Sequence, residues 1–521
     1  MSKKAKSTPS SGPSPASSTG TLQSNPEEVN EKELVEEYLA QHGLENTLNL
    51  LVNQVVRDRP ADPYLVLGGL LQSRATSSKG IFSISAREIV DSNGLPTLLA
   101  SVHTPKGRFE GSTSSFTSAI FDTDDVTRFR GMGIRARDLS LYVQHLLEGM
   151  DPSEQAACDE KILSMEDKLG RQACLALSIA ICKAGAVHKD VPLFEHIAAL
   201  ADVPIENASI PVPIFSIIHG SNFGSSKVFL QDITAMPLDC ANFQDALRWG
   251  AEFQLVLKEL LVAKGLGHPN RGVFGGFVPL VSSSDEALLL VHDALAKLKE
   301  IHPTVVPIAI GIDVAAHAFA SAQPNGDCVY NLDKWIPGSK GLLKSGDELM
   351  EIIKEWWRQH HITTVVDPFD VRDVKLASTL LRNVEDEATS SPQGEENAGI
   401  GGDASVKLQV VGHNLLQLGL DVVQEERACN TVLIHLSNFS TVTQAIKSVN
   451  QARVLGLALM MGCDPGTTDD VFPVDFAIGV GCGQVKMGGL GTADAIARYN
   501  RFASFVEDPR SPQYAGATFR R

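Results

Sequence analysis

Thr363-Thr364-Val365-Val366-Asp367-Pro368-Phe369 is a short apolar run that ends in an acidic residue and a proline. β-branched residues favour the pleated conformation, and proline cannot continue a strand ladder. The run therefore predicts a buried strand that ends at Val366, with Asp367 at the start of the following loop. The residues at this strand end are the first place to look for chemistry.

Similar apolar runs recur through the second half of the chain, separated by segments with helical periodicity. They lie at residues 213–218, 306–312, 362–366, 408–411 and 431–436. Runs that are apolar on both faces and alternate with helices are typical of parallel strands covered by helices. The pattern predicts an α/β barrel, with any site at the carboxyl ends of its strands.

The chain divides into further segments by composition. Residues 1–28 are rich in Ser, Pro, Gly and Thr, which predicts a disordered tail. Residues 29–75 have apolar residues at helical spacing, interrupted at His42-Gly43 and again at Arg59–Tyr64, which predicts a helical hairpin followed by another short helix. Residues 80–207 begin with alternating strands and continue with helices, one of which, at 172–186, is apolar nearly all round.

Two segments of the second half are expected to lie outside the regular elements. Residues 384–406 are acidic, rich in Gly and Ser and poor in apolar side chains, which predicts a disordered surface insertion. Residues 506–521 are interpreted as a C-terminal tail.

Composition narrows the possible partners. The 45 Lys and Arg against 62 Asp and Glu give a net charge of −17, which argues against binding to nucleic acid or to an anionic membrane. The eight cysteines show no CxxC or Cys/His metal spacing, and no apolar signal segment follows the N-terminus. We expect a reduced, cytoplasmic protein whose thiols are small buried hydrophobes.

Several motifs resemble those of enolases in both order and spacing. Asp91-Ser92-Asn93-Gly94-Leu95-Pro96-Thr97 is similar to the family's Asp-Ser-Arg-Gly-Asn-Pro-Thr hairpin, and it is followed by Pro211-Val212-Pro213, Gly311-Ile312-Asp313, Asp367-Pro368-Phe369 and Gly483-Gln484-Val485-Lys486-Met487-Gly488. The resemblance covers residues 81–505. It implies a small α+β domain at 80–207 and a modified (β/α)8 TIM barrel at 208–505, preceded by the helical hairpin.

The resemblance also implies three carboxylates that hold magnesium, and two of them are replaced. Asp313 is retained, whereas Val366 stands where the family has Glu and His413 where it has Asp. Mg²⁺ requires oxygen ligands in octahedral geometry, so we expect no cofactor; magnesium would be needed only if enolase activity were retained. Three alternatives stay open from sequence: a softer metal on Asp313 and His413, a hydrogen bond between these two residues, and a solvent-filled pocket.

The family's proton-transfer positions are altered in the same way. His435 stands where the family has its Lys base, and Phe274 stands at the position of the general acid, where it has no proton to give. In the family a Glu follows a Gln at a second acidic position. Here the pair is Gln231-Asp232, in which the Asp side chain is one methylene shorter than Glu. His435 and Asp232 are therefore the catalytic candidates, and Gln231 is a substrate-binding candidate.

Two further positions match the family, and one reverses its charge. Ser118 aligns with a mobile-loop Ser, and Lys486 aligns with the Lys that binds the substrate carboxylate, so both are substrate-binding candidates. Without the metal, Lys486 is expected to form a salt bridge, for which Asp313 is one candidate partner. Asp464 replaces a phosphate-binding Arg, which disfavours an anionic substrate.

Residues 33–64 resemble the dimerisation/docking helices of the regulatory subunit of cyclic-AMP-dependent kinase and of related flagellar proteins. That resemblance implies a homodimer, and a groove at residues 31–71 that takes an amphipathic helix from an anchoring partner. It also implies an axonemal or flagellar location. The alternative is a capping hairpin that packs on the chain's own domains.

Three functions stay open from sequence. The first is an enolase-like pseudoenzyme that serves as a scaffold. The second is an active phosphopyruvate hydratase, a glycolytic lyase that converts 2-phosphoglycerate to phosphoenolpyruvate. The third is a barrel repurposed to bind another ligand through His435, His413, Asp313, Asp232 and Lys486.

Overall fold

The computed structural model describes residues 35–74 apart from Glu37, and residues 80–114, 136–224, 227–324, 328–390, 408–507 and 510–520. The chain forms two compact units, residues 1–78 and residues 79–521. Each unit is described by itself below. The predicted tail at 1–28 lies outside the described residues.

The described part of the first unit is helical, with breaks at Gly43 and at residues 59–62 as predicted, and the helices that pack as a hairpin are those on either side of residues 59–62. Residues 38–42 are helical, Gly43 adopts the left-handed conformation with φ 56°, and helix α2 (Leu44–Asp58) follows. Helix α3 (Pro63–Arg74) begins at a proline, whose fixed φ suits the first turn. Helices α2 and α3 pack on each other, and Leu51 and Val55 of α2 are buried.

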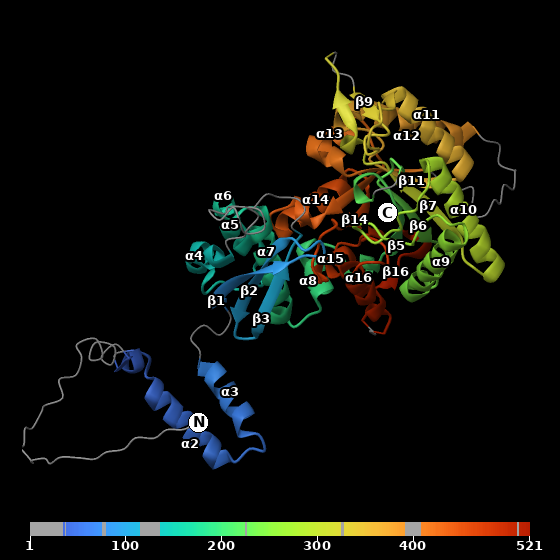
Figure 1. Cartoon of the computed structure of the whole chain (residues 1–521). Coiled ribbons are helices and arrows are strands. Elements are labelled where there is room, and N and C mark those ends of the chain that lie inside the picture. The colour runs from blue at the N-terminus through green and yellow to red at the C-terminus, as the bar shows by residue number, and fades with distance from the viewer. Residues whose placement is uncertain are drawn as a thin grey trace, which may run out of the picture. The chain divides into compact units, whose positions relative to one another are not determined.

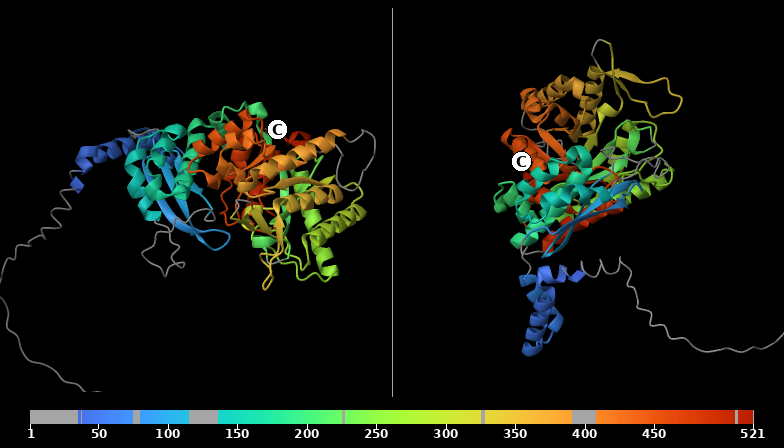
Figure 2. Two further views of the ribbon diagram at one scale, coloured as in Figure 1. Left: turned by 90° about the horizontal axis from the view of Figure 1, so that it is seen from above. Right: turned by 90° about the vertical axis from the view of Figure 1, so that its left-hand side faces the viewer.

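The second unit begins with a three-stranded antiparallel sheet of β1 (Ser83–Val90), β2 (Pro96–Thr104) and β3 (Gly107–Ser112). The turn between β1 and β2 contains Gly94 with φ 74°, and the Asp91 carboxylate accepts hydrogen bonds from two backbone N–H groups of that turn. Five helices follow the sheet, and Figures 1 and 2 show them beside it: α4 (Ala136–Leu147), α5 (Gln155–Leu163), α6 (Glu166–Leu169), α7 (Arg171–Lys189) and α8 (Leu193–Leu200). Helix α7 packs on β2 and β3 and is buried nearly all round, as expected from its sequence.

Eight strands then close into a barrel in the order β11-β12-β13-β14-β15-β5-β6-β7. Their bounds are β5 (Val212–His219), β6 (Asp232–Pro237), β7 (Ile308–Asp313), β11 (Ile362–Val366), β12 (Gln409–Gly412), β13 (Thr431–His435), β14 (Ala458–Gly462) and β15 (Gln484–Lys486). The five apolar runs identified from sequence all fall on these strands. The barrel is not wholly parallel, because β6 runs antiparallel to both β5 and β7.

Helices connect or flank the barrel strands: α9 (Phe243–Ala263), α10 (Ser284–Ile301), α11 (Gly346–His360), α12 (Val374–Ser390), α13 (Leu420–Glu425), α14 (Val442–Val454), α15 (Phe472–Gly479) and α16 (Ala493–Ser504). A small antiparallel sheet of β8 (Ala320–Ala322), β9 (Cys328–Asn331) and β10 (Leu343–Ser345) lies between β7 and α11 in the chain. The N-cap side chains of Asn242, Ser283 and Ser345 fix the starts of α9, α10 and α11.

The expected insertion begins later than its sequence suggests. Helix α12 continues to Ser390, because Val384 is buried and Glu385 pairs with Arg427 at 3.1 Å. A second ion pair joins Glu387 to Arg358. The acidic residues 385–387 therefore belong to a helix, and residues 391–407 lie outside the described part.

The expected C-terminal tail is also corrected. Strand β16 (Gln513–Tyr514) pairs with β4 (Ser209–Ile210), and Phe519 is buried in the same apolar cluster as Val212 and Leu433 inside the barrel. A side chain at Gly483 would collide with the Phe519 carbonyl, so glycine permits this close approach. These residues close one end of the barrel and do not form a tail.

All eight cysteines are free and buried, as predicted for structural thiols. Among the described residues, no helix is long and apolar enough to cross a membrane.

Candidate functional site

The candidate residues meet at one end of the barrel because of where their strands end. Asp313, Val366, His435 and Lys486 are the last residues of β7, β11, β13 and β15, respectively. Asp232 is the first residue of β6, but β6 is antiparallel, so Asp232 pairs in register with Asp313 at the same rim. Sequence positions more than 250 residues apart are thereby brought together.

Lys486 lies between two buried carboxylates. Its Nζ is 3.2 Å from Asp232 Oδ2 and 3.1 Å from Asp313 Oδ2. Burial alone would lower the pKa of Lys486, but Asp313 and Asp232 together raise it above its ordinary value. Burial raises the pKa of Asp232 to about 7, against the lowering effect of Lys486. The salt bridge to Asp313 that was suggested from sequence is confirmed.

His219, the last residue of β5, adds a neutral ring beside this group. Its Nε2 is 3.7 Å from Asp232 Oδ1, and both side chains are fully buried. Burial, together with the positive charge of Lys486, lowers the pKa of His219 to about 3. The ring also lies edge-on to Phe223 at 5.4 Å between centroids. His219 therefore does not supply a second positive charge.

Val366 points into the barrel. It is 3% exposed and belongs to an apolar cluster that includes Val411, Leu433 and Met460 from neighbouring strands. Its register partners are Asp313 on β7 and Val411 on β12. An alkyl group thus occupies the position beside Asp313 where the enolase resemblance implies a metal-ligating carboxylate.

His413 does not bond to Asp313, which corrects one of the alternatives open from sequence. Its Nε2 lies 3.2 Å from Asn438 Nδ2, and its ring centroid lies 4.1 Å from that of His435. Burial, together with His435, holds the pKa of His413 well below its usual value. Asp313 forms an ion pair with Lys486 instead, because an ammonium ion is a stronger hydrogen-bond donor to a carboxylate than a neutral imidazole.

The carboxylate of Asp367, next to Val366, is also engaged in hydrogen bonds within the protein. Asp367 Oδ1 accepts hydrogen bonds from the backbone N–H groups of His413 at 2.8 Å and Asn414 at 3.1 Å, and Asn414 Nδ2 donates to Oδ2 at 2.7 Å. Burial, and then the charge of Asp313, raise the pKa of Asp367 to about 7. Asp367 therefore fixes the loop after β12.

These residues do not fit Mg²⁺. The donor set offers one ion-paired carboxylate, one alkyl group and one imidazole, whereas Mg²⁺ prefers six hard oxygen ligands. Among the described residues, no group of three His, Cys, Asp or Glu side chains is arranged to hold a metal. The same geometry disfavours a softer metal held by Asp313 and His413.

His435 and Asp464 form a buried pair that sequence reasoning missed. His435 Nδ1 lies 2.7 Å from Asp464 Oδ1, and Ser437 Oγ donates a hydrogen bond to Asp464 Oδ2. Burial would raise the pKa of Asp464, but His435 and Ser437 lower it below its ordinary value. His435 and Asp464 each replace a different residue of the family, and the two new side chains complement each other. The joint replacement at these two positions was the signal that the sequence offered.

Phe274 is buried and faces the ion pair. The Lys486 Nζ lies 5.9 Å from the centroid of its ring, and Phe223 lies 6.2 Å away on another side. The aromatic face attracts the ammonium ion, but it has no proton to donate. The acid position is thus filled by a group that stabilises Lys486.

Three further residues complete the description of the site. Gln231 has a half-buried side chain, and its backbone N–H donates to the Asp313 carbonyl at 2.9 Å. Ser118 lies outside the described residues. Ser216, which was not singled out from sequence, donates to Asp232 Oδ2 at 2.5 Å.

Comparison with known families agrees with this architecture. Residues 81–197 match the family model "Enolase, N-terminal domain", and residues 207–521 match "Enolase, C-terminal TIM barrel domain". The chain belongs to the enolase family. The matched barrel runs to the last residue of the chain, in agreement with the packing of β16 and Phe519.

Similar proteins carry the same family name. "Cytosolic enolase 3" of Arabidopsis thaliana is 31% identical over 496 residues, which covers 91% of this chain and 96% of the relative. "Enolase 2" of Hevea brasiliensis is 30% identical over 465 residues, covering 84% and 98%, and "Enolase" of Eimeria tenella is 31% identical with the same coverage. The chain is therefore a divergent member of the enolase family that matches nearly the full length of these relatives.

Proposed function

We propose that this enolase-family chain does not dehydrate 2-phosphoglycerate and serves as a structural component. The observation that carries the proposal is the position of Lys486, whose ammonium ion pairs with both Asp232 and Asp313. A metal ion at Asp313 would have to displace this internal cation. It would then find Val366 where a further oxygen ligand is needed.

The chemistry of the reaction supports the same proposal. Removal of a proton next to a carboxylate, followed by loss of hydroxide, builds negative charge that needs a cationic stabiliser. Phe274 cannot donate the proton that the departing hydroxide requires. Asp464 presents a negative charge where a phosphate would need a positive one, and at about 4 Å such a repulsion is roughly 4 kcal/mol at an effective dielectric of 20.

A turnover assay tests the loss of activity. Purified full-length protein is incubated with 2-phosphoglycerate and Mg²⁺, and the absorbance of phosphoenolpyruvate is followed. An authentic enolase at the same concentration is the positive control. We expect a rate equal to that of buffer, and a reproducible rate above buffer that scales with protein concentration rejects the proposal.

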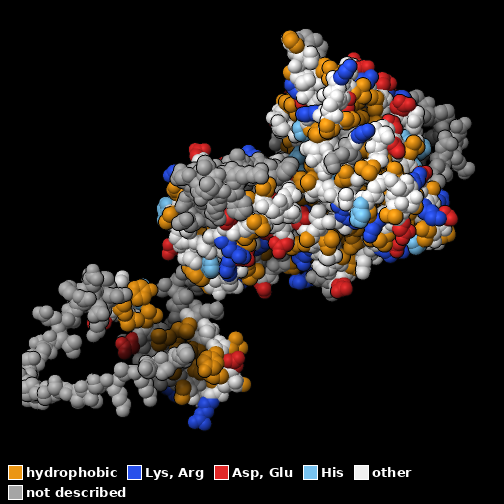
Figure 3. All heavy atoms as spheres, in the orientation of Figure 1, with side chains coloured by type: hydrophobic (Ala, Val, Ile, Leu, Met, Phe, Trp, Pro, Cys, Tyr) orange, Lys and Arg blue, Asp and Glu red, His pale blue; other side chains and the backbone are white. Residues whose placement is uncertain are grey.

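The helical hairpin supports the structural role. Leu48, Val52 and Val56 recur every four residues on α2 and are 42%, 43% and 64% exposed, respectively. They lie beside the buried Leu51 and Val55, so the apolar stripe of α2 is wider than the part that faces α3. Figure 3 shows hydrophobic side chains gathered on this unit. We propose that the exposed part pairs with the hairpin of a second copy, and that the paired hairpins form the groove for an amphipathic anchoring helix.

Two substitutions on one helix test the pairing. Leu48→Asp places a charge in the stripe, whereas Leu50→Asp places it on the opposite side of α2, where Leu50 is 58% exposed. Sedimentation of the full-length chain is expected to give a lower mass for Leu48→Asp and an unchanged mass for Leu50→Asp. Equal masses for both variants and the unsubstituted chain contradict pairing through this face.

The second candidate is an active phosphopyruvate hydratase. It is favoured by relatives named enolase that match nearly their whole length at 30–31% identity. The same turnover assay decides between the two. The name of the relative "Cytosolic enolase 3" supports a cytosolic location, and an axonemal or flagellar location rests on the resemblance of the hairpin to docking helices.

A further inference from the structure

A cavity of about 50 Å³ lies where the N-terminal domain meets the barrel. Ser112 and Ser114, at and just beyond the end of β3, line it on one side, and His435, Ser437 and Asp464 line it from the ends of β13 and β14. Ser112 Oγ lies 2.6 Å from Thr468 Oγ1, and Ser114 Oγ donates to the Gly466 carbonyl at 2.9 Å. Both domains therefore hold the cavity walls in place.

His435 presents an unmet acceptor to this cavity. Ionised Asp464 can only accept hydrogen bonds, so the ring must carry its hydrogen on Nδ1. In the neutral ring, Nε2 then has a free lone pair, and it has no hydrogen-bond partner within the described part of the chain. Gly462 also lines the cavity, and a Cβ at that position would lie 2.4 Å from Nε2. Glycine thus leaves this nitrogen accessible.

Arg498 supplies an unmet donor. It is fully buried, lines the cavity and donates from Nη2 to Asp494 at 2.9 Å and from Nη1 to Thr467 at 2.8 Å. Its Nε–H is buried without a partner among the described residues. A group that both donates and accepts a hydrogen bond, such as a hydroxyl, matches this combination with His435.

The cations at and beside the cavity already have carboxylate partners. Asp470 pairs with Lys183 at 2.7 Å, and Arg498 pairs with Asp494. The Asp464 carboxylate accepts hydrogen bonds from the neutral His435 ring and from Ser437, and it keeps its negative charge. No described cation that lines the cavity is left without a carboxylate partner, so a carboxylate or phosphate ligand would enter beside Asp464 with no compensating charge.

The other walls are apolar. Leu175 and Ile179 on α7, together with Pro473 on α15, supply hydrocarbon surface. A cavity of about 50 Å³ has room for about three to five atoms the size of a water, since one water requires roughly 10–15 Å³. The ligand must therefore be short.

We propose that this cavity binds a small uncharged alcohol or diol, whose hydroxyl donates to His435 Nε2 and whose carbon chain packs on Leu175 and Ile179. The site lies at the barrel mouth, and Asp464 makes it unfavourable for an anionic ligand. It goes beyond the proposed structural role and does not depend on whether 2-phosphoglycerate is turned over.

Ligand-observed saturation-transfer NMR on the full-length chain tests the proposal with three probes. Propane-1,2-diol fits in size and charge, lactate has the same carbon skeleton with a carboxylate, and hexane-1,2-diol exceeds the cavity. We expect saturable binding of propane-1,2-diol in the millimolar range and at least tenfold weaker binding of the other two. Equal binding of lactate overturns the charge preference, equal binding of hexane-1,2-diol overturns the cavity as the site, and no binding of any probe overturns the proposal.

A substitution then locates the hydroxyl. His435→Phe keeps an aromatic ring but removes the acceptor, whereas His145→Phe alters an exposed histidine on α4. We expect His435→Phe to weaken propane-1,2-diol binding at least tenfold and His145→Phe to leave it unchanged. Binding within twofold of the unsubstituted chain in His435→Phe overturns the contact. If circular dichroism shows His435→Phe to be unfolded, propane-1,2-diol should shift a backbone amide signal of Ile179 or Gly462 in the unsubstituted chain, and the absence of both shifts overturns the site.

Discussion

Lys486 Nζ lies 3.1 Å from Asp313 Oδ2, and the two side chains are each 6% exposed. A lysine thus supplies, inside the protein, the positive charge that Asp313 would otherwise obtain from a bound cation. Breaking a buried ion pair leaves the remaining charge without solvent or partner. The pair therefore links the stability of the barrel mouth to the proposed loss of metal-dependent chemistry.

Replacement of Lys486 should destabilise the protein in a pH-dependent manner. Lys486→Met leaves Asp232 and Asp313 buried together, and we expect a loss of about 3–5 kcal/mol at pH 8. Because Lys486 lowers the pKa of Asp232, its removal raises that pKa above 7, far above the ordinary value of 3.8. A raised carboxyl pKa favours the folded state at low pH, so the loss should shrink as the pH falls below 7. Chemical denaturation at pH 5 and pH 8 measures both values.

The double variant Lys486→Met, Asp232→Asn is the matched control. It removes one of the two carboxylates and should recover part of the stability at pH 8 with little change at pH 5. An equal loss at both pH values, or no recovery in the double variant, would show that the lysine stem and not its charge matters.

Val366→Glu should not restore enolase activity. The new carboxylate would lie among Val411, Leu433 and Met460, where burial raises its pKa and favours the neutral form. Phe274 and Asp464 would remain, so neither the acid nor the phosphate-binding charge returns. We expect no turnover of 2-phosphoglycerate, no Mg²⁺ binding by calorimetry, and a loss of about 2–5 kcal/mol of stability.

Val366→Met is the control for packing, since it changes shape without adding charge. As an enlarged apolar side chain it should cost about 1–3 kcal/mol, and any additional loss in Val366→Glu is due to the buried carboxyl group. Turnover in Val366→Glu would mean that the other replaced positions matter far less than their chemistry suggests.

The barrel could be predicted from sequence because its strands are encoded locally. Each is a short run of apolar residues whose β-branched members favour the strand, such as Ile362–Val366 and Thr431–His435. The replaced metal ligand at Val366 was likewise visible in one motif. The reversed direction of β6 was not, since an apolar run has the same pattern in either direction.

Contacts between distant segments were harder to predict. His435 and Asp464 are 29 residues apart and meet only because β13 and β14 are adjacent in the barrel. Considered alone, Asp464 indicated only that a phosphate would be repelled. In the fold, Asp464 orients the imidazole of His435. The segment around Phe519 looked like a tail because its burial depends on the barrel end that it covers.

Gly462→Ala should disturb His435 without straining the backbone. The added Cβ would lie 2.4 Å from His435 Nε2, so the ring must move away from its hydrogen bond with Asp464. Overpacking of this kind costs about 1–3 kcal/mol. The same substitution in a His435→Ala background should cost at least about 0.5 kcal/mol less, because the contact with the ring is gone and only Leu433 Cδ1, at 2.8 Å from the added Cβ, must shift. Denaturation of the four proteins of this cycle measures the coupling, and equal costs in both backgrounds would contradict the contact.

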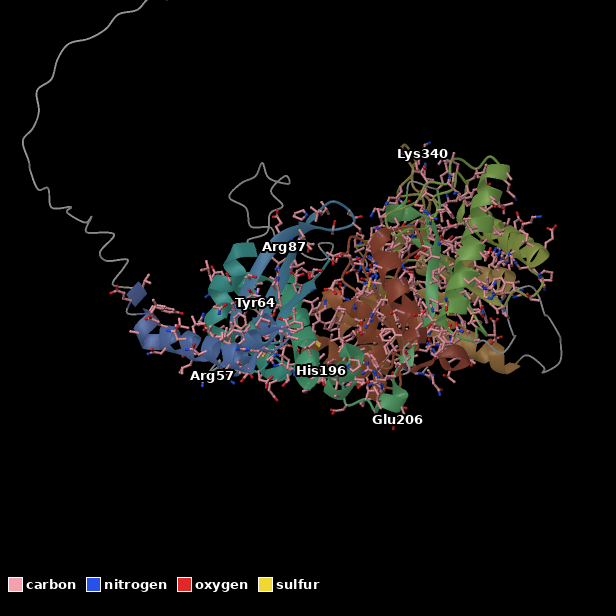
Figure 4. All side chains as sticks on the ribbon, turned by 90° about the horizontal axis from the view of Figure 1, so that it is seen from below. Arg57, Tyr64, Arg87, His196, Glu206 and Lys340 are labelled. Atoms are coloured by element: carbon pink, nitrogen blue, oxygen red, sulfur yellow. The ribbon has the colours of Figure 1, made fainter. Side chains whose placement is uncertain are left out.

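His196 should make the folded state sensitive to mild acid. It lies on α8 and is labelled in Figure 4; it is 1% exposed, and neither ring nitrogen has a partner among the described residues. Burial, with a smaller contribution from Lys189, lowers the pKa of His196 to about 4 from an ordinary value of 6.5. Between these two values the unfolded chain takes up a proton that the folded chain refuses, so stability falls as the pH falls. From pH 7 to pH 5 this residue should contribute a loss of about 2 kcal/mol.

His196→Gln keeps a polar side chain without a titrating ring and should remove that part of the pH dependence. His145→Gln, on the exposed face of α4, should leave it unchanged. His219 and His413, whose pKa values are also lowered by burial, act in the same direction in all three proteins, so the difference between variants isolates His196. The measurement is the free energy of unfolding at pH 7 and pH 5. The same change with pH in His196→Gln and the unsubstituted chain would mean that His196 is protonated in the folded state, which its burial without partners makes unfavourable.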